Sequence, residues 1–169
     1  LATTGGRVSS TGVAGLTLGG GSGWLERKYG LTCDNVLAVE LVTADGELVR
    51  AAADENPELF WALRGGGGNF GVVTAFEFAL HEVGPVVMAG LVLHPAERGR
   101  ELLALYRDAM NDGPDELSLA FVYLTAPAEP EIPEALHGRP AVAIAGMYAG
   151  STEEGAEALR AIREFGPPA

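Results

Sequence analysis

The sequence predicts an α+β protein built on antiparallel sheets, and three observations support this fold class. An Asp45-Gly46 pair separates two β-branched runs, which is the strongest short-range indication of a hairpin. Residues 86–169 contain segments in the order β-α-β-β-α, which generally form an antiparallel sheet with helices on one face. No apolar stretch reaches 18 residues, so we expect no contact with a membrane.

The first half of the chain contains the predicted hairpin and a third strand. Residues 36–44 form a β-branched run, and residues 47–51 follow the Asp-Gly pair as its hairpin partner. Residues 71–80 alternate partly between apolar and polar side chains, which predicts another strand. Asp34 and Asn35 are expected to cap the turn before the first strand.

A short helix is predicted between the hairpin and the third strand. Asn56 suits the N-cap, Pro57 suits the first helical position, and Gly65 ends the segment. We expect this helix to bury aromatic side chains on neighbouring faces. The aromatic residues expected in the core are Trp24, Tyr29, Phe60 and Trp61.

A domain boundary is predicted near Pro85, which gives domains of residues 1–85 and 86–169. Beyond the boundary glycine becomes sparse and the apolar pattern becomes regular. Ser151 and Glu154 have the spacing of a capping box at the start of the last helix. The expected strands are 86–93, 117–125 and 141–148, and the expected helices are 95–110 and 152–165.

Composition and charge exclude several classes of function. The net charge is −12 and no Lys/Arg stripe is present, so we expect no nucleic acid partner. Cys33 is the single cysteine, so no intrachain disulfide is expected, and a cytoplasmic location is favoured because no signal peptide is visible. The histidines, His81, His94 and His137, are isolated, so no metal site is expected.

Two glycine clusters, Gly12–Gly23 and Gly65–Gly71, are the most informative feature of the chain. Fifteen of the 24 glycines lie in the first 71 residues, so the enrichment is local. Ordered glycine costs conformational entropy, and a dense run therefore needs a reason. The clusters alternate with apolar residues, unlike a polar linker. This favours backbone that approaches a ligand over a purely structural role.

Common glycine-rich phosphate motifs do not match. Neither cluster has the lysine of a P-loop, and the spacing from Gly19 fails the dinucleotide fingerprint because Trp24 occupies the third glycine position. No Ser-His-Asp or paired-carboxylate arrangement can be assembled from spacing. The residues alone indicate a glycine-lined site for a large, partly apolar ligand that carries a phosphate.

Three segments resemble, in order and spacing, the berberine-bridge-enzyme-like FAD-linked oxidases of the vanillyl-alcohol-oxidase superfamily. They are Gly12–Asn35, Val39–Gly46 and Asn56–Thr74. The resemblance covers residues 1–80 closely and the rest in general pattern. It implies that residues 1–85 form the second subdomain of a PCMH-type FAD-binding domain and that residues 86–169 begin an antiparallel-sheet substrate domain. The remainder of the same protein would complete the flavin cleft, so this chain alone is expected to be inactive.

The resemblance implies an FAD site made of two strips. The strip beside the isoalloxazine ring and ribityl chain contains Val8, Ser9, Ser10, Thr11, Gly12, Gly15 and Leu16. The strip towards the adenine end contains Asn69, which fixes a turn, followed by Gly71, Val72 and Val73. Val8 replaces the cysteine of bicovalent members, which excludes a second covalent link. Thr11 occupies the position beside the flavin that affects oxygen access in the family. A threonine there does not decide between an oxidase and a dehydrogenase.

The implied activity is that of an FAD-dependent oxidoreductase acting on a small molecule. The flavin would take a hydride from an alcohol, sugar or amine carbon and pass electrons to oxygen or another acceptor. No residue of this chain is assigned as the catalytic base. One alternative is a truncated, non-catalytic flavoprotein-like module. Another is a phosphate-cradling enzyme outside the flavin class, which the missing lysine disfavours.

Overall fold

The structure is a computed structural model that describes residues 1–166, and it divides into two compact units, Leu1–Val83 and Gly84–Ala169. The division falls two residues before the expected end of the first domain. Assignment of the units to an FAD-binding and a substrate domain stays a prediction. Among the described residues, no helix has the length and apolar character needed to cross a lipid bilayer.

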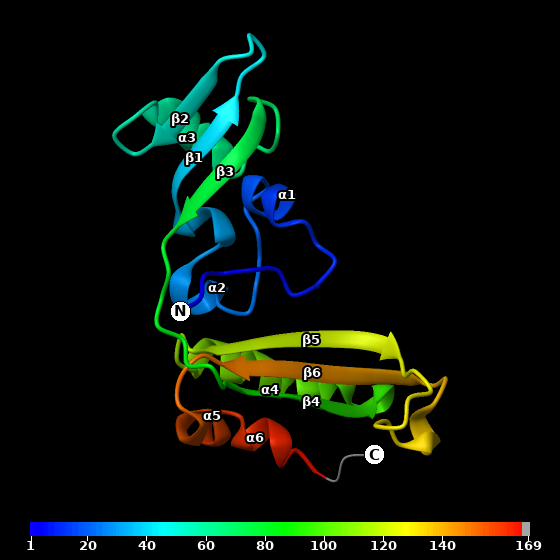
Figure 1. Ribbon diagram of the computed structural model, residues 1–169. Helices are drawn as coiled ribbons and strands as arrows, with labels where there is room; N and C mark the ends of the chain where they lie inside the picture. Colours follow the sequence, from blue (N-terminus) through cyan, green and yellow to red (C-terminus); the bar gives the residue numbers. More distant parts are fainter. Residues whose placement is uncertain (167–169) are drawn as a thin grey trace. The chain divides into compact units, whose positions relative to one another are not determined.

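The first unit contains a three-stranded antiparallel sheet in the order β2-β1-β3, formed by β1 (Val36–Val42), β2 (Leu48–Ala52) and β3 (Val72–Phe78) (Figure 1). The predicted hairpin is confirmed. The Thr43 N–H donates to the Glu47 carbonyl at 2.9 Å, and Gly46 has φ 81°, a conformation that glycine adopts without steric cost.

The helix α3 (Pro57–Leu63) covers this sheet with Phe60 and Leu63, which are buried in one core with Val39 and Leu41. The expectation that Trp61 is in the core is wrong, because its side chain is 79% exposed. Trp61 follows Phe60 by one position, a rotation of about 100° around the helix, which turns it away from the sheet. Two of the other expected core aromatics are half-buried: Trp24 and Tyr29.

The start of α3 also differs from the prediction. Asn56 has φ 50° and ψ 53°, in the left-handed region, and its side chain does not cap the helix. Its Nδ2 instead donates to the Arg50 carbonyl at 2.7 Å. Asn56 therefore fixes the turn between β2 and α3, while Pro57 begins the helix as expected.

Short helices and a tight turn precede β1: α1 (Val13–Leu18), α2 (Glu26–Tyr29) and the 3-10 helix η1 (Thr32–Asn35). The expected capping of the last turn is confirmed. The Leu31 N–H donates to Asp34 Oδ2 at 2.9 Å, and Asn35 Nδ2 donates to the Leu31 carbonyl at 2.8 Å. These side chains satisfy backbone groups that the short turn would leave without partners.

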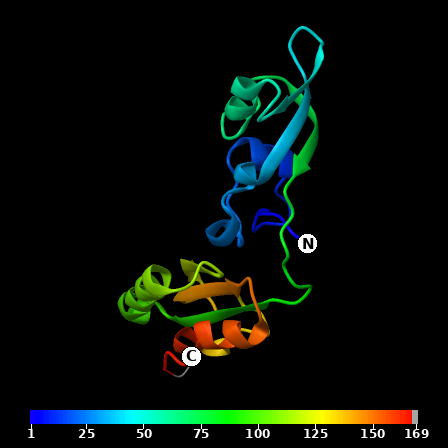
Figure 2. The same cartoon turned by 90° about the vertical axis from the view of Figure 1, so that its left-hand side faces the viewer.

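The second unit contains an antiparallel sheet in the order β4-β6-β5, formed by β4 (Met88–Pro95), β5 (Leu117–Thr125) and β6 (Pro140–Tyr148). The helices are α4 (Gly99–Asp112), α5 (Thr152–Ala158) and α6 (Arg160–Arg163), with 3-10 turns η2 (Ala96–Arg98) and η3 (Glu134–Leu136). The expected order β-α-β-β-α is confirmed. Figure 2 shows the three helices beside the sheet.

One core joins these helices to a single face of the sheet. Leu102 of α4 and Ile162 of α6 share it with Leu119 and Ile144, which lie on the same face of neighbouring strands. The predicted helix 95–110 begins later, at Gly99, after η2. The predicted helix 152–165 is interrupted at Leu159, which has φ −90° and ψ −2° and separates α5 from α6.

The expected N-cap of α5 by Ser151 is confirmed, while Glu154 Oε2 accepts from the Ser151 hydroxyl at 2.9 Å. The Glu154 N–H donates to Ser151 Oγ at 3.2 Å, as the sequence spacing predicts.

Candidate functional site

The first predicted strip is an exposed turn followed by a helix. The Thr11 N–H donates to the Val8 carbonyl at 3.0 Å, and Val8 is 61% exposed. Gly12 then caps α1, whose first intrahelical bond runs from the Leu16 N–H to the Gly12 carbonyl at 3.1 Å. Gly15 and Leu16, the last two residues of this strip, lie within the helix α1 (Val13–Leu18), which the sequence analysis did not predict.

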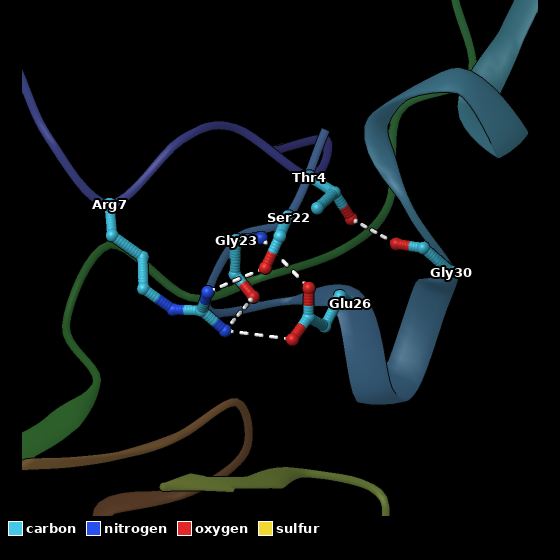
Figure 3. Close-up of polar contacts among 6 residues, drawn as sticks. All are labelled: Thr4, Arg7, Ser22, Gly23, Glu26 and Gly30. Carbon is cyan, nitrogen blue, oxygen red and sulfur yellow. Dashed lines mark hydrogen bonds and ion pairs between the residues drawn. The ribbon is translucent and has the colours of Figure 1, made fainter. Parts of the chain in front are cut away.

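Arg7 anchors the chain immediately before this strip (Figure 3). Its Nη1 donates to Ser22 Oγ at 2.6 Å, and its Nη2 donates to the Gly23 carbonyl at 3.0 Å and to Glu26 Oε1 at 2.8 Å. The Gly23 N–H in turn donates to Glu26 Oε2 at 3.1 Å. Three points of attachment hold the segment before Val8 against the start of α2.

The electrostatics of this anchor follow from its burial and charges. Burial raises the pKa of the Glu26 carboxyl, but hydrogen bonds from Ser22, Arg7 and Gly23 and the charge of Arg7 outweigh it and lower the pKa below its ordinary value. The Arg7 guanidinium also lies 5.2 Å from the ring centre of Trp24. Sequence analysis missed Arg7, since the contact partners are 15 to 19 residues away.

The second strip begins in the loop before β3. Asn69 Nδ2 donates to the Gly66 carbonyl at 2.9 Å, so Asn69 fixes this turn. The Gly67 N–H donates to the Leu18 carbonyl at 2.8 Å, at the end of α1. The structure therefore brings the two glycine clusters into direct contact within the first unit.

Beyond the loop, the second strip continues into β3. Val72 is 72% exposed and Val73 is half-buried. The strand lies at the edge of the three-stranded sheet, next to β1. The two predicted strips thus lie on elements that touch through Gly67 and Leu18, and Val8 and Val72 both present apolar side chains to solvent.

Several glycines in the clusters are explained by the packing of the protein itself. A Cβ at Gly21 would overlap the side chain of Thr32, and one at Gly23 would overlap the Gly5 carbonyl. A Cβ at Gly66 would overlap the Ala62 carbonyl, and one at Gly71 would overlap the Val42 carbonyl. Gly71 is expected to contact the cofactor, which stays a prediction. Its lack of a side chain is also required by the backbone of β1, because a Cβ would overlap the carbonyl of Val42, which pairs with the neighbouring Val72.

Gly12 and Gly15 belong to a different class. A Cβ at either position would meet no atom within 4 Å, and neither residue has a positive φ. Glycine inside a helix costs about 0.5–1 kcal/mol relative to alanine, so Gly15 is unfavourable for α1 itself. Internal packing does not account for these two glycines. Open, side-chain-free backbone of this kind fits the close approach of a flat ring system.

The surroundings of Cys33 and His137 do not favour a catalytic role for either side chain. Cys33 is buried, and burial followed by the charge of Asp34 raises the pKa of its thiol, which disfavours the reactive thiolate. His137 Nε2 lies 2.8 Å from the Ile132 carbonyl. Among residues 1–166, no group of three or more His, Cys, Asp or Glu side chains could hold a metal ion.

Comparisons with known proteins match the start of the chain to a flavin-binding family. A sequence family described as FAD binding domain matches residues 1–52. The chain is 43% identical over 119 residues to (R)-6-hydroxynicotine oxidase from Paenarthrobacter nicotinovorans, which covers 69% of this chain and 26% of that relative.

Two solved structures extend the similarity to both units. The crystal structure of 6-hydroxy-D-nicotine oxidase from Arthrobacter nicotinovorans aligns with a TM-score of 0.82 and 34% identity, over 99% of this chain and 36% of that one. Berberine-bridge-enzyme-like protein 1 from Physcomitrella patens aligns with a TM-score of 0.80 and 28% identity, over 99% of this chain and 34% of that one. The chain thus spans between 26% and 36% of the length of these relatives.

Three findings lead to one assignment. The family model matches residues that include the first strip, the sequence is similar to a named oxidase, and two solved structures share the fold of the chain. The open backbone at Gly12 and Gly15 fits the flavin that the family binds. The chain belongs to the berberine-bridge-enzyme-like FAD-linked oxidoreductases with a PCMH-type FAD-binding domain, and its cofactor is FAD.

Proposed function

We propose that residues 1–85 supply one wall of the FAD cleft in an enzyme that removes a hydride from an alcohol, sugar or amine carbon of a small molecule. The electrons pass to oxygen or another acceptor. The observation that carries the proposal is the open backbone at Gly12 and Gly15, next to the exposed strip Val8–Thr11. An amine substrate is one of the candidates because a relative is named a hydroxynicotine oxidase.

Bound FAD supplies the redox chemistry, and the residues of this chain supply position. The seven residues of the first strip would lie along the ring and ribityl chain: Val8, Ser9, Ser10, Thr11, Gly12, Gly15 and Leu16. Arg7 holds the start of this strip through its bonds to Gly23 and Glu26. Asn69, Gly71, Val72 and Val73 would face the adenine end, and the Gly67–Leu18 bond sets their distance from the first strip.

Neither strip carries a group suited to proton abstraction at neutral pH. Their polar side chains are the hydroxyls of Ser9, Ser10 and Thr11 and the amide of Asn69. The base that takes the substrate proton would therefore come from other residues. Residues 86–169 are the first part of the substrate domain in this proposal, and further residues of the same protein complete the cleft.

The test is the absorption spectrum and flavin content of the protein expressed from its whole open reading frame. We expect yellow flavin bands that persist through purification or return on adding FAD. Gly15→Leu should lower FAD affinity at least about tenfold, because the new side chain would fill the space assigned to the ring. Gly90→Leu is the matched control, since Gly90 is equally open but lies in β4.

A folded, colourless protein at saturating FAD would contradict the proposal and favour the non-catalytic module. If Gly15→Leu and Gly90→Leu bind FAD equally well, the placement of the first strip is wrong, although the family assignment would stand.

A further inference from the structure

The three strands of the second unit contain no charged residue. No position of β4, β5 or β6 is Asp, Glu, Lys or Arg, although 20% of the residues in the whole chain are charged. An antiparallel sheet with one face in solvent usually alternates apolar and polar residues, whereas strands covered on both faces are apolar throughout. The composition of these strands therefore indicates that both faces of the sheet are covered in the working protein.

The helices cover one of these two faces. Val92, Leu119 and Ile144 point into the core that α4, α5 and α6 form against the sheet. Successive side chains of a strand point to opposite faces, and direct partners on neighbouring strands share a face. The second face is therefore made by the alternate positions of each strand, which are Ala89, Leu91, Leu93, Ser118, Ala120, Val122, Leu124, Ala141, Ala143, Ala145 and Met147.

A loop of the same unit closes one end of the second face. This loop, between β5 and β6, forms a small core with the strands, made by Ala126, Ile132 and Leu136 with Leu93, Leu124 and Ala141. Away from this end, Leu91 is 60% exposed and Val122 is 45% exposed. Removing such side chains from water is favourable, so this part of the face suits an apolar occupant.

The middle of the second face is low and flat. Leu91, Ala145 and Ala120 are direct partners across the three strands. Neighbouring strands lie about 4.8 Å apart, so this row is roughly 10 Å wide. Two of its three side chains are single methyl groups, which leave a shallow surface beside the larger Leu91. A surface of this shape and chemistry suits the face of a planar ring.

We infer that the substrate of the enzyme carries a planar, uncharged, apolar ring and that the second face contacts this ring. The inference rests on the proposed function, in which residues 86–169 belong to the substrate domain. It narrows the proposed substrates to alcohols and amines that carry such a ring, and it excludes free sugars.

The polar groups of a sugar would find no partners on this face. Ser118 is the only residue of the second face whose side chain has a hydroxyl, amide or charged group, and it is 5% exposed. A sugar has hydroxyls around its ring, and each of them costs free energy when it is buried without a hydrogen bond. A charged group against this face would likewise meet no opposite charge. Charge and hydrogen bonding therefore both favour a neutral, apolar ring.

Isothermal titration calorimetry tests the inference on the flavin-loaded protein expressed from its whole open reading frame. Quinoline and 2-naphthol are the planar probes, and glucose and cellobiose are the sugar probes. We expect the Kd of the planar probes to be at least about tenfold lower than that of the sugars. Leu91→Gln should raise the Kd of quinoline at least about fivefold, because the new amide must lose water against the ring.

Leu103→Gln is the matched control. Leu103 is also partly exposed, at 46%, but it lies on α4 and not on the second face. This change should leave the Kd of quinoline within about twofold of the wild-type value. Thermal unfolding of both variants measures any effect of the new amide on stability.

Three results would overturn the inference. The first is sugar binding as tight as that of the planar probes. The second is equal binding of quinoline by Leu91→Gln and Leu103→Gln. The third is a loss of thermal stability in Leu91→Gln alone, without a change in probe binding, which would show that further polypeptide covers the second face. Each result leaves the flavin spectrum of the wild type unchanged, so the proposed function would stand, whereas a protein that binds no FAD would contradict the proposed function itself.

Discussion

His81 Nε2 lies 2.6 Å from Asn35 Oδ1, and the remaining contacts of Asn35 determine which of the two atoms donates. Asn35 Nδ2 donates to the carbonyls of Tyr29 at 3.0 Å and Leu31 at 2.8 Å, so Oδ1 must be the acceptor. His81 therefore carries a hydrogen on Nε2. The ring of Tyr29 stacks on that of His81, with centres 4.0 Å apart. One buried amide thus joins the turn before β1 to His81, three residues beyond the end of β3.

Replacing Asn35 with leucine should lower the free energy of unfolding by about 2–3 kcal/mol. The change removes both donors, leaves the Tyr29 carbonyl without this partner and the Leu31 carbonyl with the Asp34 N–H alone, and removes the acceptor of His81. Urea denaturation measures the loss. Asn69→Leu is the control, because that exposed amide makes one bond, to the Gly66 carbonyl, and should cost less than about 1 kcal/mol. Equal losses would contradict this role for Asn35.

The two classes of glycine predict opposite effects on stability in the absence of flavin. Gly15→Ala should raise the free energy of unfolding by about 0.5–1 kcal/mol, because the helix gains propensity and the new methyl group meets nothing. Gly71→Ala should lower it by more than about 1 kcal/mol, because its φ is 151° and the methyl group would overlap the Val42 carbonyl. Urea denaturation of both variants checks the contrast. A destabilising Gly15→Ala would show that Gly15 has a packing role.

Glu26→Gln should lower stability by about 1 kcal/mol at pH 7 by weakening the anchor on Arg7. The folded pKa of Glu26 lies below its ordinary value of 4.5, so the stabilisation is present above that pH and is lost as the pH falls through the folded pKa. The difference between wild type and variant should therefore narrow below pH 4.5. Thermal unfolding from pH 7 to pH 3.5 measures it, with Glu47→Gln on the exposed hairpin as the control. A difference that is independent of pH would contradict the assigned charge interaction.

His94 should make the second unit sensitive to acid. Burial, with a smaller effect from the charge of Arg98, lowers the pKa of His94 below 6.5, so the unfolded chain binds a proton more readily than the folded one. Stability should fall as the pH drops below 6.5. His94→Phe should reduce this dependence and keep a ring against Phe165, whose centre lies 5.4 Å away. Guanidinium unfolding at pH 7 and pH 5.5 compares the wild type with the variant. An equal loss of unfolding free energy between the two pH values in both proteins would refute the effect of His94.

The sequence predicted those elements whose determinants are local. Asp45-Gly46 specifies a tight turn by itself, and Ser151 caps a helix through the N–H of Glu154 three residues later, so the hairpin and this N-cap are confirmed. The helix α1 was not predicted, because Gly12 and Gly15 weaken the helical pattern of a segment that is held in place by its contact with Gly67. Helix propensity is a weak guide where tertiary contacts decide.

The candidate site shows the same division. Open backbone could be inferred from the density of glycine, but the sequence could not separate Gly15, which faces open space, from Gly71, which faces Val42. That distinction depends on the pairing of β1 with β3. The anchor formed by Arg7 and Glu26 was also invisible, since the two residues have no periodic relation. Trp61 was assigned to the core because large aromatic residues are usually buried, whereas its position on α3 turns it outwards.

The contact between the Gly67 N–H and the Leu18 carbonyl has a consequence for the entropy of cofactor binding. Pieces of surface nearly fifty residues apart in sequence are set at a fixed spacing before anything binds. A dinucleotide has many rotatable bonds and loses conformational entropy when it binds. A binding site that is already rigid does not lose a comparable amount. Little of the entropy lost on association would then come from the polypeptide.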